Sequence, residues 1–186
     1  MASGDNHGRP FVIVDKTAAQ VFVFHADGRL RGAAPVLVGF ARGDDSAAGV
    51  GERALSAIRP DQRTTPAGRF VARFGRAKGE RRVLWVDYVD AISLHPVVTA
   101  NPTEHRLRRI RSSAPEDHRI SYGCINVPAR FYREVVLKAF ARGSGVVYIL
   151  PDTKSLEEVF PGLAVRPIAA SQEPAEASGQ TPSDFR

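Results

Sequence analysis

The sequence has only one cysteine among its 186 residues. This excludes an internal disulfide and any metal site built from several thiolates. The five histidines and 20 acidic residues show no metal-ligand spacing, so we expect neither a metal nor another cofactor. No apolar run approaches the roughly 18 residues of a membrane-spanning helix, so we expect no membrane span.

The start of the chain, MASGDNHGRP, also lacks the apolar segment of a secretory leader. We therefore expect that the protein stays inside the cell if Met1 is the native start. Otherwise a leader was removed and a starting methionine was added. The sequence leaves the oligomeric state open.

Basic residues outnumber acidic ones by 26 to 20, which gives a formal net charge of +6. This balance permits attraction to polyanions. No zinc-finger, helix-turn-helix or RNA-recognition motif accompanies it, so we expect no nucleic-acid partner. A basic nucleic-acid binder is the weakest function considered, because its only support is an arginine cluster at residues 106–111.

The length and the 43% hydrophobic content predict one soluble domain. The 16 glycines and 13 prolines favour a turn-rich, mainly β fold. Short apolar runs predict strands at residues 11–14, 21–25, 34–40, 69–74, 82–88, 91–95 and 145–150. We expect a flexible N-terminus over residues 1–9, one folded domain over residues 10–152, and a C-terminal extension over residues 153–186. The polar composition predicts disorder after about residue 168.

One main helix is expected over residues 128–143. Pro128 suits the first helical position, and Gly143 suits the position just after the helix ends. Phe131 and Val135 lie four residues apart and begin a wide apolar stripe. We therefore expect the helix to pack against the sheet.

Cys124 lies in the segment RISYGCINVP, immediately after a glycine. A thiolate attacks a carbonyl carbon, so a catalytic cysteine needs a neighbouring base. Gly123 would allow a tight turn that aims backbone N–H groups at the resulting oxyanion. A lone cysteine is more often a small buried apolar residue, so this pattern needs a partner to indicate catalysis.

The partner has to be a histidine. His95 ends the apolar pattern AISLH, which would hold it on a rigid strand. His105 and His118 belong to a long arginine-rich loop, whereas His7 and His25 lie in the N-terminus and at a hairpin. We favour His95 as the base and keep His105 as the alternative.

These residues together resemble a known family. The segment SYGCIN, residues 121–126, is similar to the S/T-H-G-C signature of the YkuD-type L,D-transpeptidases. The segment TTPAGRF, residues 64–70, is similar to that family's TP-x-G-x-F segment, and AISLH resembles the strand that carries its base histidine. The motifs also occur in the family's order, and the resemblance covers roughly residues 10–152.

The resemblance implies a β-sandwich-like L,D-transpeptidase catalytic domain with one main helix after the catalytic cysteine. Members cleave the bond between the third residue of a peptidoglycan stem tetrapeptide and its terminal D-alanine. They pass the acyl group through a thioester to an amine, which gives cross-linking or acyl exchange in the cell wall. The implied location is the periplasm or cell envelope, and acylation of the thiol by carbapenems is a further expectation.

By position, the resemblance makes Cys124 the nucleophile and His95 the base. The backbone around Tyr122, Gly123 and Cys124 would form the oxyanion hole. Ser121 and Asn126 would shape the site. We also expect the side chains of Tyr122, Arg119 and Tyr88 to contact the substrate.

Two departures from the family pattern leave alternatives open. Tyr122 replaces the usual histidine before Gly-Cys, which favours a non-catalytic peptidoglycan-binding module. The spacing from His95 to Cys124 is longer than is common, so the arginine-rich residues between them are interpreted as an inserted lid. Its arginines are expected to face water or to attract stem-peptide carboxylates. If water resolves the thioester, the same site is an L,D-carboxypeptidase or an amide hydrolase.

Overall fold

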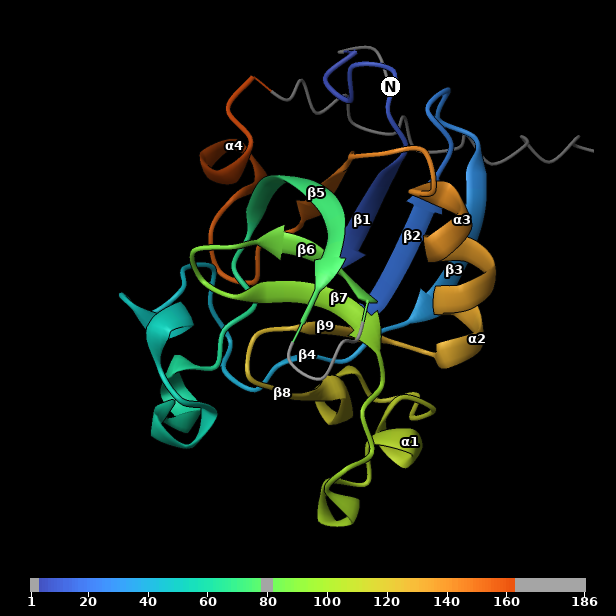
Figure 1. Cartoon of the computed structure of the whole chain (residues 1–186). Helices are drawn as coiled ribbons and strands as arrows, with labels where there is room; N and C mark the ends of the chain where they lie inside the picture. Colours follow the sequence, from blue (N-terminus) through green and yellow to red (C-terminus); the bar gives the residue numbers. More distant parts are fainter. Residues whose placement is uncertain (1–3, 78–81, 163–186) are drawn as a thin grey trace, which may run out of the picture.

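The computed structural model describes residues 4–77 and 82–162. This part of the chain is mainly β, as predicted, with one large mixed sheet and a small second sheet (Figure 1). The large sheet has the strand order β3-β2-β1-β10-β5-β6-β7-β9, and the small one pairs β4 with β8. The strands are β1 (Phe11–Asp15), β2 (Gln20–Phe24), β3 (Leu30–Pro35), β4 (Val38–Gly39), β5 (Gly68–Arg76), β6 (Arg82–Asp87), β7 (Ile92–Pro96), β8 (Arg119–Ser121), β9 (Ile125–Val127) and β10 (Gly145–Ile149).

The helical segments of the described residues are short. The α-helices are α1 (Arg106–Arg109), α2 (Ala129–Phe131), α3 (Leu137–Ala139) and α4 (Leu156–Val159). Single 3-10 turns occur at Val50–Glu52, Leu55–Ala57, Pro60–Gln62, Pro102–Glu104 and Pro115–His118. A π-helical turn, Tyr132–Val136, joins α2 to α3, so the predicted main helix is one continuous run that begins at Ala129.

The large sheet changes direction at β5. Residues Gly68–Ala72 of β5 pair with β10, whereas Arg73–Arg76 pair with β6. One strand therefore belongs to both halves of the sheet, and in Figure 1 β6 and β7 run across the direction of β1 and β2. The helical run covers the sheet beside β2 and β3, and buries the apolar stripe predicted for it. The core joins β1, β2, β6, β7, β9 and this helix through Val12, Val14, Val21, Val23, Leu84, Leu94, Ile125, Tyr132, Val136 and Phe140.

Most predicted strands are confirmed, but the one expected over residues 34–40 is wrong. The return strand of the first hairpin is β3, which pairs with β2 and ends at Pro35. Proline cannot donate to a strand ladder, so the chain leaves the sheet there. The next residues form β4, which pairs in parallel with β8. Strands β8 and β9 have only three residues each, too few for a period-two pattern to reveal.

A buried charged cluster fastens the long loop of residues 41–64 to the sheet. The Lys16 ammonium, at the end of β1, lies 2.8 Å from a carboxylate oxygen of Asp44. It also donates to the carbonyl oxygens of Gly43 and Thr65 at 2.6 and 2.9 Å. The Asp44 carboxylate accepts the backbone N–H groups of residues 152–154 at 2.6–2.8 Å. Burial raises the pKa of Asp44, but Lys16 and these N–H groups outweigh it and hold that pKa well below its usual value.

The described part of the N-terminus contacts the domain. The Asn6 side chain donates to the carbonyl oxygens of Arg9 and Ala26, both at 2.8 Å, and Asp5 forms an ion pair with Arg69. The flexibility expected of residues 1–9 stays a prediction. The disorder expected after about residue 168 lies outside the described residues.

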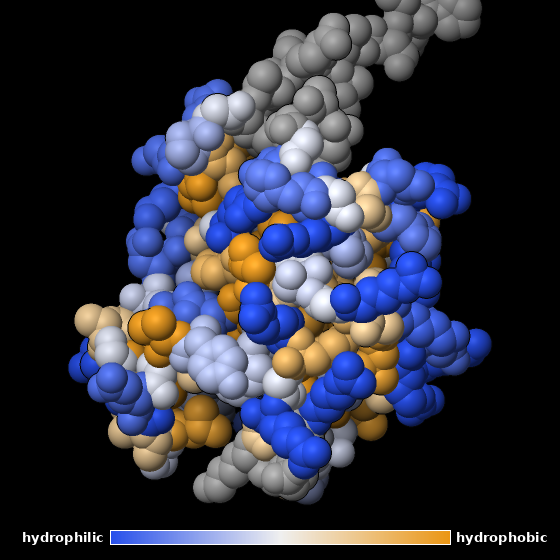
Figure 2. All heavy atoms as spheres, turned by 45° about the horizontal axis from the view of Figure 1, so that its top comes forward, coloured by the Kyte–Doolittle hydropathy of each residue, from blue (hydrophilic) through white to orange (hydrophobic). Residues whose placement is uncertain are grey.

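The surface shown in Figure 2 carries many hydrophilic side chains, with smaller apolar areas between them. The large apolar side chains that remain exposed come from several different segments, which is ordinary for a folded domain. They are Leu30, Phe40, Leu55, Val71, Tyr88, Val89, Leu107 and Leu156. Within residues 4–77 and 82–162, no helix is both long and apolar enough to cross a membrane. The same residues contain no group of three or more His, Cys, Asp or Glu side chains that could hold a metal ion.

The Asp44→Asn variant should lose about 3 kcal/mol of unfolding free energy at pH 7, because the buried Lys16 ammonium loses its nearest carboxylate and keeps only Asp152, at 3.6 Å. The carboxylate stabilises the fold above its unfolded-state pKa of about 4. That contribution is lost as the pH falls toward the lower folded-state pKa. In urea unfolding, the difference between wild type and the variant should therefore narrow from about pH 5 to pH 3.

Asp45 provides the matched control, because its side chain is 74% exposed. Asp45→Asn should change stability by less than about 1 kcal/mol. Equal destabilisation by the two substitutions would contradict the role given to the buried cluster.

Candidate active site

Cys124 lies in a tight turn between β8 and β9. β8 pairs with β4, and β9 pairs with β7, so both ends of the turn are fixed to sheets. The Ser121 hydroxyl closes the turn from within. It accepts the Gly123 N–H at 3.1 Å and donates to the Cys124 carbonyl at 2.6 Å. Ser121 therefore shapes the turn that presents the thiol.

Gly123 is required by the conformation of this turn. Its φ is +122°, a region that other residues rarely adopt. A side chain there would also place its Cβ 2.8 Å from the backbone oxygen of Thr64. Thr65 contributes a support, because its hydroxyl donates to the Gly123 carbonyl at 2.7 Å and accepts the Gly39 N–H at 2.8 Å. The segment TTPAGRF thus holds the cysteine turn from behind.

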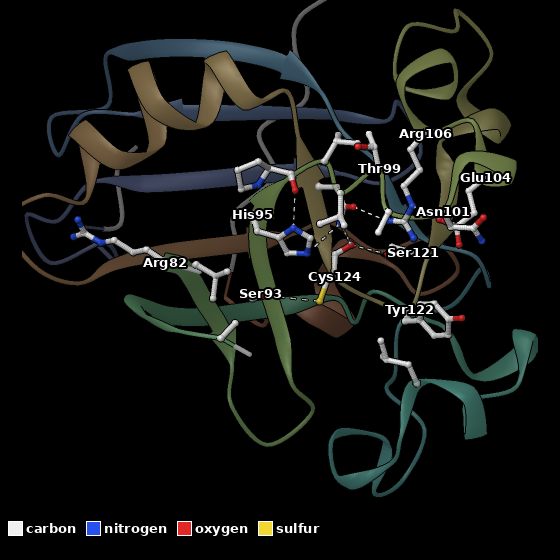
Figure 3. A pocket seen from close by; sticks show the side chains of 18 residues that line it. Arg82, Ser93, His95, Thr99, Asn101, Glu104, Arg106, Ser121, Tyr122 and Cys124 are labelled. Atoms are coloured by element: carbon white, nitrogen blue, oxygen red, sulfur yellow. Dashed lines mark hydrogen bonds and ion pairs between the residues drawn. The ribbon is translucent and has the colours of Figure 1, made fainter. Parts of the chain in front are cut away.

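The thiol faces residues carried by β7. The Cys124 sulfur lies 3.7 Å from the Ser93 hydroxyl and 3.6 Å from the Ala91 carbonyl oxygen. The imidazole of His95, two residues after Ser93, projects into the same space (Figure 3). β7 and β9 pair in parallel with His95 opposite Asn126. This register brings the histidine beside the cysteine turn.

The hydrogen bonds of His95 define its tautomer. Nδ1 lies 2.8 Å from the carbonyl oxygen of Pro96. A carbonyl oxygen only accepts, so Nδ1 carries the proton and Nε2 of the neutral ring is free to take one. Nε2 lies 3.5 Å from Nδ2 of Asn126. The ring therefore offers an unprotonated nitrogen on its cleft side, as a general base must.

The environment of Cys124 favours the thiolate. Burial raises the pKa of the thiol. The neighbouring imidazole of His95 acts in the opposite direction, with further contributions from Ser93. Together they outweigh burial, so the pKa of Cys124 lies below its ordinary value. A lowered thiol pKa increases the nucleophilic fraction at neutral pH.

A cavity of about 730 Å³ opens over the thiol. Its walls come from β7, from the cysteine turn and from the lid, by which we mean residues 97–118 (Figure 3). The motif residues at its surface are Ser93, His95, Ser121, Tyr122, Cys124 and Asn126. The lid contributes Val97, Val98, Thr99, Ala100, Asn101, Glu104 and Arg106.

Three of the expected substrate contacts lie at this cavity, namely Ser121, Tyr122 and Asn126. The Tyr122 ring packs beneath the guanidinium of Arg63, whose central carbon is 4.1 Å from the ring centroid. Tyr122 therefore forms part of the cavity wall, where it is joined to the loop of residues 41–64.

The positions of Arg119 and Tyr88 do not support the substrate contacts expected of them. Arg119 is 8% exposed, and its guanidinium donates to Asp152 at 2.7 Å within the buried charged cluster. Tyr88 is 68% exposed and packs against Trp85, with ring centroids 4.6 Å apart. Neither residue lines the cavity. The substrate contacts of both residues stay predictions.

The other two loop histidines are held elsewhere. His105 is exposed, has a left-handed conformation and does not line the cavity. His118 is buried, and its ring nitrogens lie 2.9 Å from the Val36 carbonyl oxygen and 3.0 Å from that of Ser112. The structure thus brings His95, rather than His105, to the cysteine turn.

The sequence did not indicate two groups at the site, Ser93 and Arg106. Ser93 is an inward-facing residue of an apolar strand, and its position in AISLH could have identified it as a neighbour of His95. Arg106 was expected to face water or stem-peptide carboxylates. Its guanidinium instead donates to the Asn126 side-chain oxygen at 2.7 Å. No local pattern predicts this contact, because the two residues meet only through the fold.

No protein-family profile and no curated protein matches the sequence. The chain is similar in fold to L,D-transpeptidases of solved structure. The L,D-transpeptidase (Yku) from Stackebrandtia nassauensis is 14% identical with a TM-score of 0.44, over 77% of this chain and 56% of that one. The catalytic domain of the E. faecium L,D-transpeptidase is 13% identical with a TM-score of 0.41, over 77% of this chain and 98% of that one.

The helical cell shape determining protein Pgp2 from Campylobacter jejuni is also similar. It is 16% identical with a TM-score of 0.48, over 78% of this chain and 49% of that one. The chain thus spans about half the length of two of these three proteins. These likenesses concern the fold, and the chemistry proposed below rests on the geometry of the cavity.

The His95→Asn variant should alkylate at Cys124 at least about tenfold more slowly with iodoacetamide at pH 7. The substitution removes the imidazole whose proximity lowers the thiol pKa, so the pH profile of alkylation should move to higher pH. Mass spectrometry of the intact protein, sampled over time across about pH 5 to 9, measures these rates.

The matched control is His105→Asn, since asparagine also tolerates the left-handed conformation at that position. Its alkylation profile should coincide with that of wild type. An unmoved profile in the His95 variant, or equal shifts in both, would rule out His95 as the partner of the thiol.

Proposed function

We propose that the protein is a cysteine-dependent L,D-transpeptidase that acts on peptidoglycan stem peptides through an acyl-thioester. The observation that carries the proposal is the pairing of Cys124 with His95 in one cavity, with Nδ1–H of His95 held by the Pro96 carbonyl. The resemblance of SYGCIN and TTPAGRF to the family motifs supports the substrate class. An enzyme of this kind works in the periplasm or cell envelope, where peptidoglycan lies.

The first half-reaction forms the thioester. The thiol proton passes to Nε2 of His95, and the sulfur attacks the carbonyl carbon that precedes the terminal D-alanine. A C–S bond forms, and the carbonyl oxygen becomes an oxyanion. When this intermediate collapses, the C–N bond breaks and Nε2–H protonates the departing amine. D-alanine leaves, and the tripeptide acyl group stays on Cys124.

The oxyanion needs N–H donors near the sulfur. The Gly123 N–H already donates to Ser121, so it stabilises the turn in place of the oxyanion. The backbone N–H of Cys124 has no hydrogen-bond partner among residues 4–77 and 82–162. We assign this N–H, with that of Tyr122, to the oxyanion hole. Gly123 then contributes through its conformation.

The second half-reaction transfers the acyl group. An acceptor amine attacks the thioester, Nε2 of His95 removes its proton, and the C–S bond breaks to restore the thiol pair. Val97, Val98 and Ala100 of the lid line the cavity in which this transfer would take place.

Wild-type protein incubated with a stem tetrapeptide, or with a carbapenem, should gain the mass of one acyl group. Cys124→Ala should gain none, and His95→Ala should form the adduct at least about 100-fold more slowly. Mass spectrometry of the intact protein measures both effects. A wild type that neither gains an acyl group nor converts the tetrapeptide, or an adduct of equal yield on Cys124→Ala, would refute the proposed chemistry.

The same samples separate the alternatives. A cross-linked or amine-exchanged peptide indicates transpeptidation, and free tripeptide indicates L,D-carboxypeptidase activity. Peptidoglycan binding by both wild type and Cys124→Ala, without any adduct, would instead indicate a non-catalytic binding module.

A further inference from the structure

One arginine of the lid, Arg106, lies at the wall of the cavity. Arg106 is the first residue of α1, and only 10% of its side chain is exposed. Its guanidinium forms an ion pair with Glu104 on one side and donates to Oδ1 of Asn126 at 2.7 Å on the other. Figure 3 shows Arg106 beside Glu104 at the cavity wall opposite Arg82. A side chain held by two partners has a fixed position.

The contact with Arg106 determines the orientation of the Asn126 amide. A guanidinium only donates, so the amide must turn its oxygen toward Arg106. Its nitrogen then faces the other way, 3.3 Å from the Cys124 carbonyl oxygen and 3.5 Å from Nε2 of His95. Asn126 is completely buried, so it has no water to satisfy a reversed orientation.

The orientation of this amide matters for the proton of His95. With the amide nitrogen toward Nε2, Asn126 can donate to the unprotonated nitrogen of the neutral ring, but it cannot accept the Nε2–H of a protonated ring. That N–H is then left for the Cys124 thiolate, whose pKa it lowers. In the reversed orientation, Oδ1 of Asn126 would accept the Nε2–H and compete with the thiolate for it.

We propose that Arg106 is a positioning residue, which fixes the Asn126 amide so that the proton on Nε2 of His95 is directed to Cys124. The inference rests on the proposed pairing of His95 with Cys124. It gives the lid a role beyond covering the cavity, because its contacts run from Glu104 through Arg106 and Asn126 to the ring of His95.

The lid is built to hold Arg106 in place. Asn101 begins the Pro102–Glu104 turn and accepts the Thr103 N–H at 3.2 Å. His105 has a left-handed φ of 48°, which turns the chain from Glu104 into α1. Arg109 donates to the Glu104 carbonyl oxygen at 3.0 Å. These contacts fix both ends of the Glu104–Arg106 pair.

The test compares Arg106→Met with Arg108→Met. Arg108 lies on the same short helix and carries the same charge, but it is exposed to solvent. The readout is the pH profile of Cys124 alkylation by iodoacetamide. Arg106→Met should alkylate at least about threefold more slowly at pH 7, with its profile moved to higher pH. Arg108→Met should match wild type, and Arg106→Lys, which keeps a donor and the charge, should recover part of the rate.

A double-mutant cycle with Asn126→Ala separates positioning from loss of charge. If Arg106 acts through the amide, adding Arg106→Met to Asn126→Ala should cause no further slowing. The same slowing in both backgrounds would overturn the proposal, as would equal profiles for Arg106→Met and Arg108→Met.

Thermal unfolding of each variant shows whether Asn126→Ala folds. If Asn126→Ala does not fold, the alternative measurement is nitrogen NMR of the His95 ring in Arg106→Met and Arg108→Met. A titration midpoint of His95 that moves in Arg106→Met alone supports the proposal, and one unchanged in both overturns it. Alkylation and NMR need no peptidoglycan substrate. A failure of this inference is therefore distinguishable from a failure to form acyl adducts.

Discussion

The parallel pairing of β7 with β9 is the contact on which the site depends. It places His95 opposite Asn126, two residues after Cys124, and thereby joins the proposed base to the turn of the proposed nucleophile through strand pairing. Parallel neighbours cannot be joined by a hairpin, so the chain must make a long connection between them. That connection contains the lid, β8 and the cysteine turn. Some length of chain between His95 and Cys124 is therefore needed for the two residues to lie close in space.

The turn that presents the thiol is held from two directions. Within the turn, Ser121 satisfies the Gly123 N–H and the Cys124 carbonyl. Behind it, Thr65 supports Gly123, and the carbonyl of Thr65 accepts the buried Lys16 ammonium. The charged cluster thus connects to the reacting residue through one side chain. A preorganised turn of this kind keeps N–H donors in place before substrate arrives.

The sequence predicted the parts of the molecule that local patterns encode. Apolar runs located β1, β2, β5, β6, β7 and β10, and the stripe from Phe131 to Phe140 located the main helix. The position of His95 at a strand end predicted that it would be fixed, and Gly123 predicted the turn. The sequence could not predict contacts made through the fold. Arg119 is expected at the substrate because the sequence does not show that Asp152 is its partner. Arg106 is expected to face solvent or substrate because the sequence does not show its contact with Asn126.

The central claim is that Cys124, paired with His95, accepts the acyl group of a stem peptide and releases its terminal D-alanine. The most direct measurement uses a tetrapeptide whose terminal D-alanine is isotopically labelled, followed by peptide mapping of the protein. In a first turnover, stopped by acid before the thioester is resolved, the account predicts release of one labelled D-alanine for each tripeptide acyl group found on the peptide that contains Cys124. Release without any acyl group on that peptide, or an acyl group located on another residue, would contradict it.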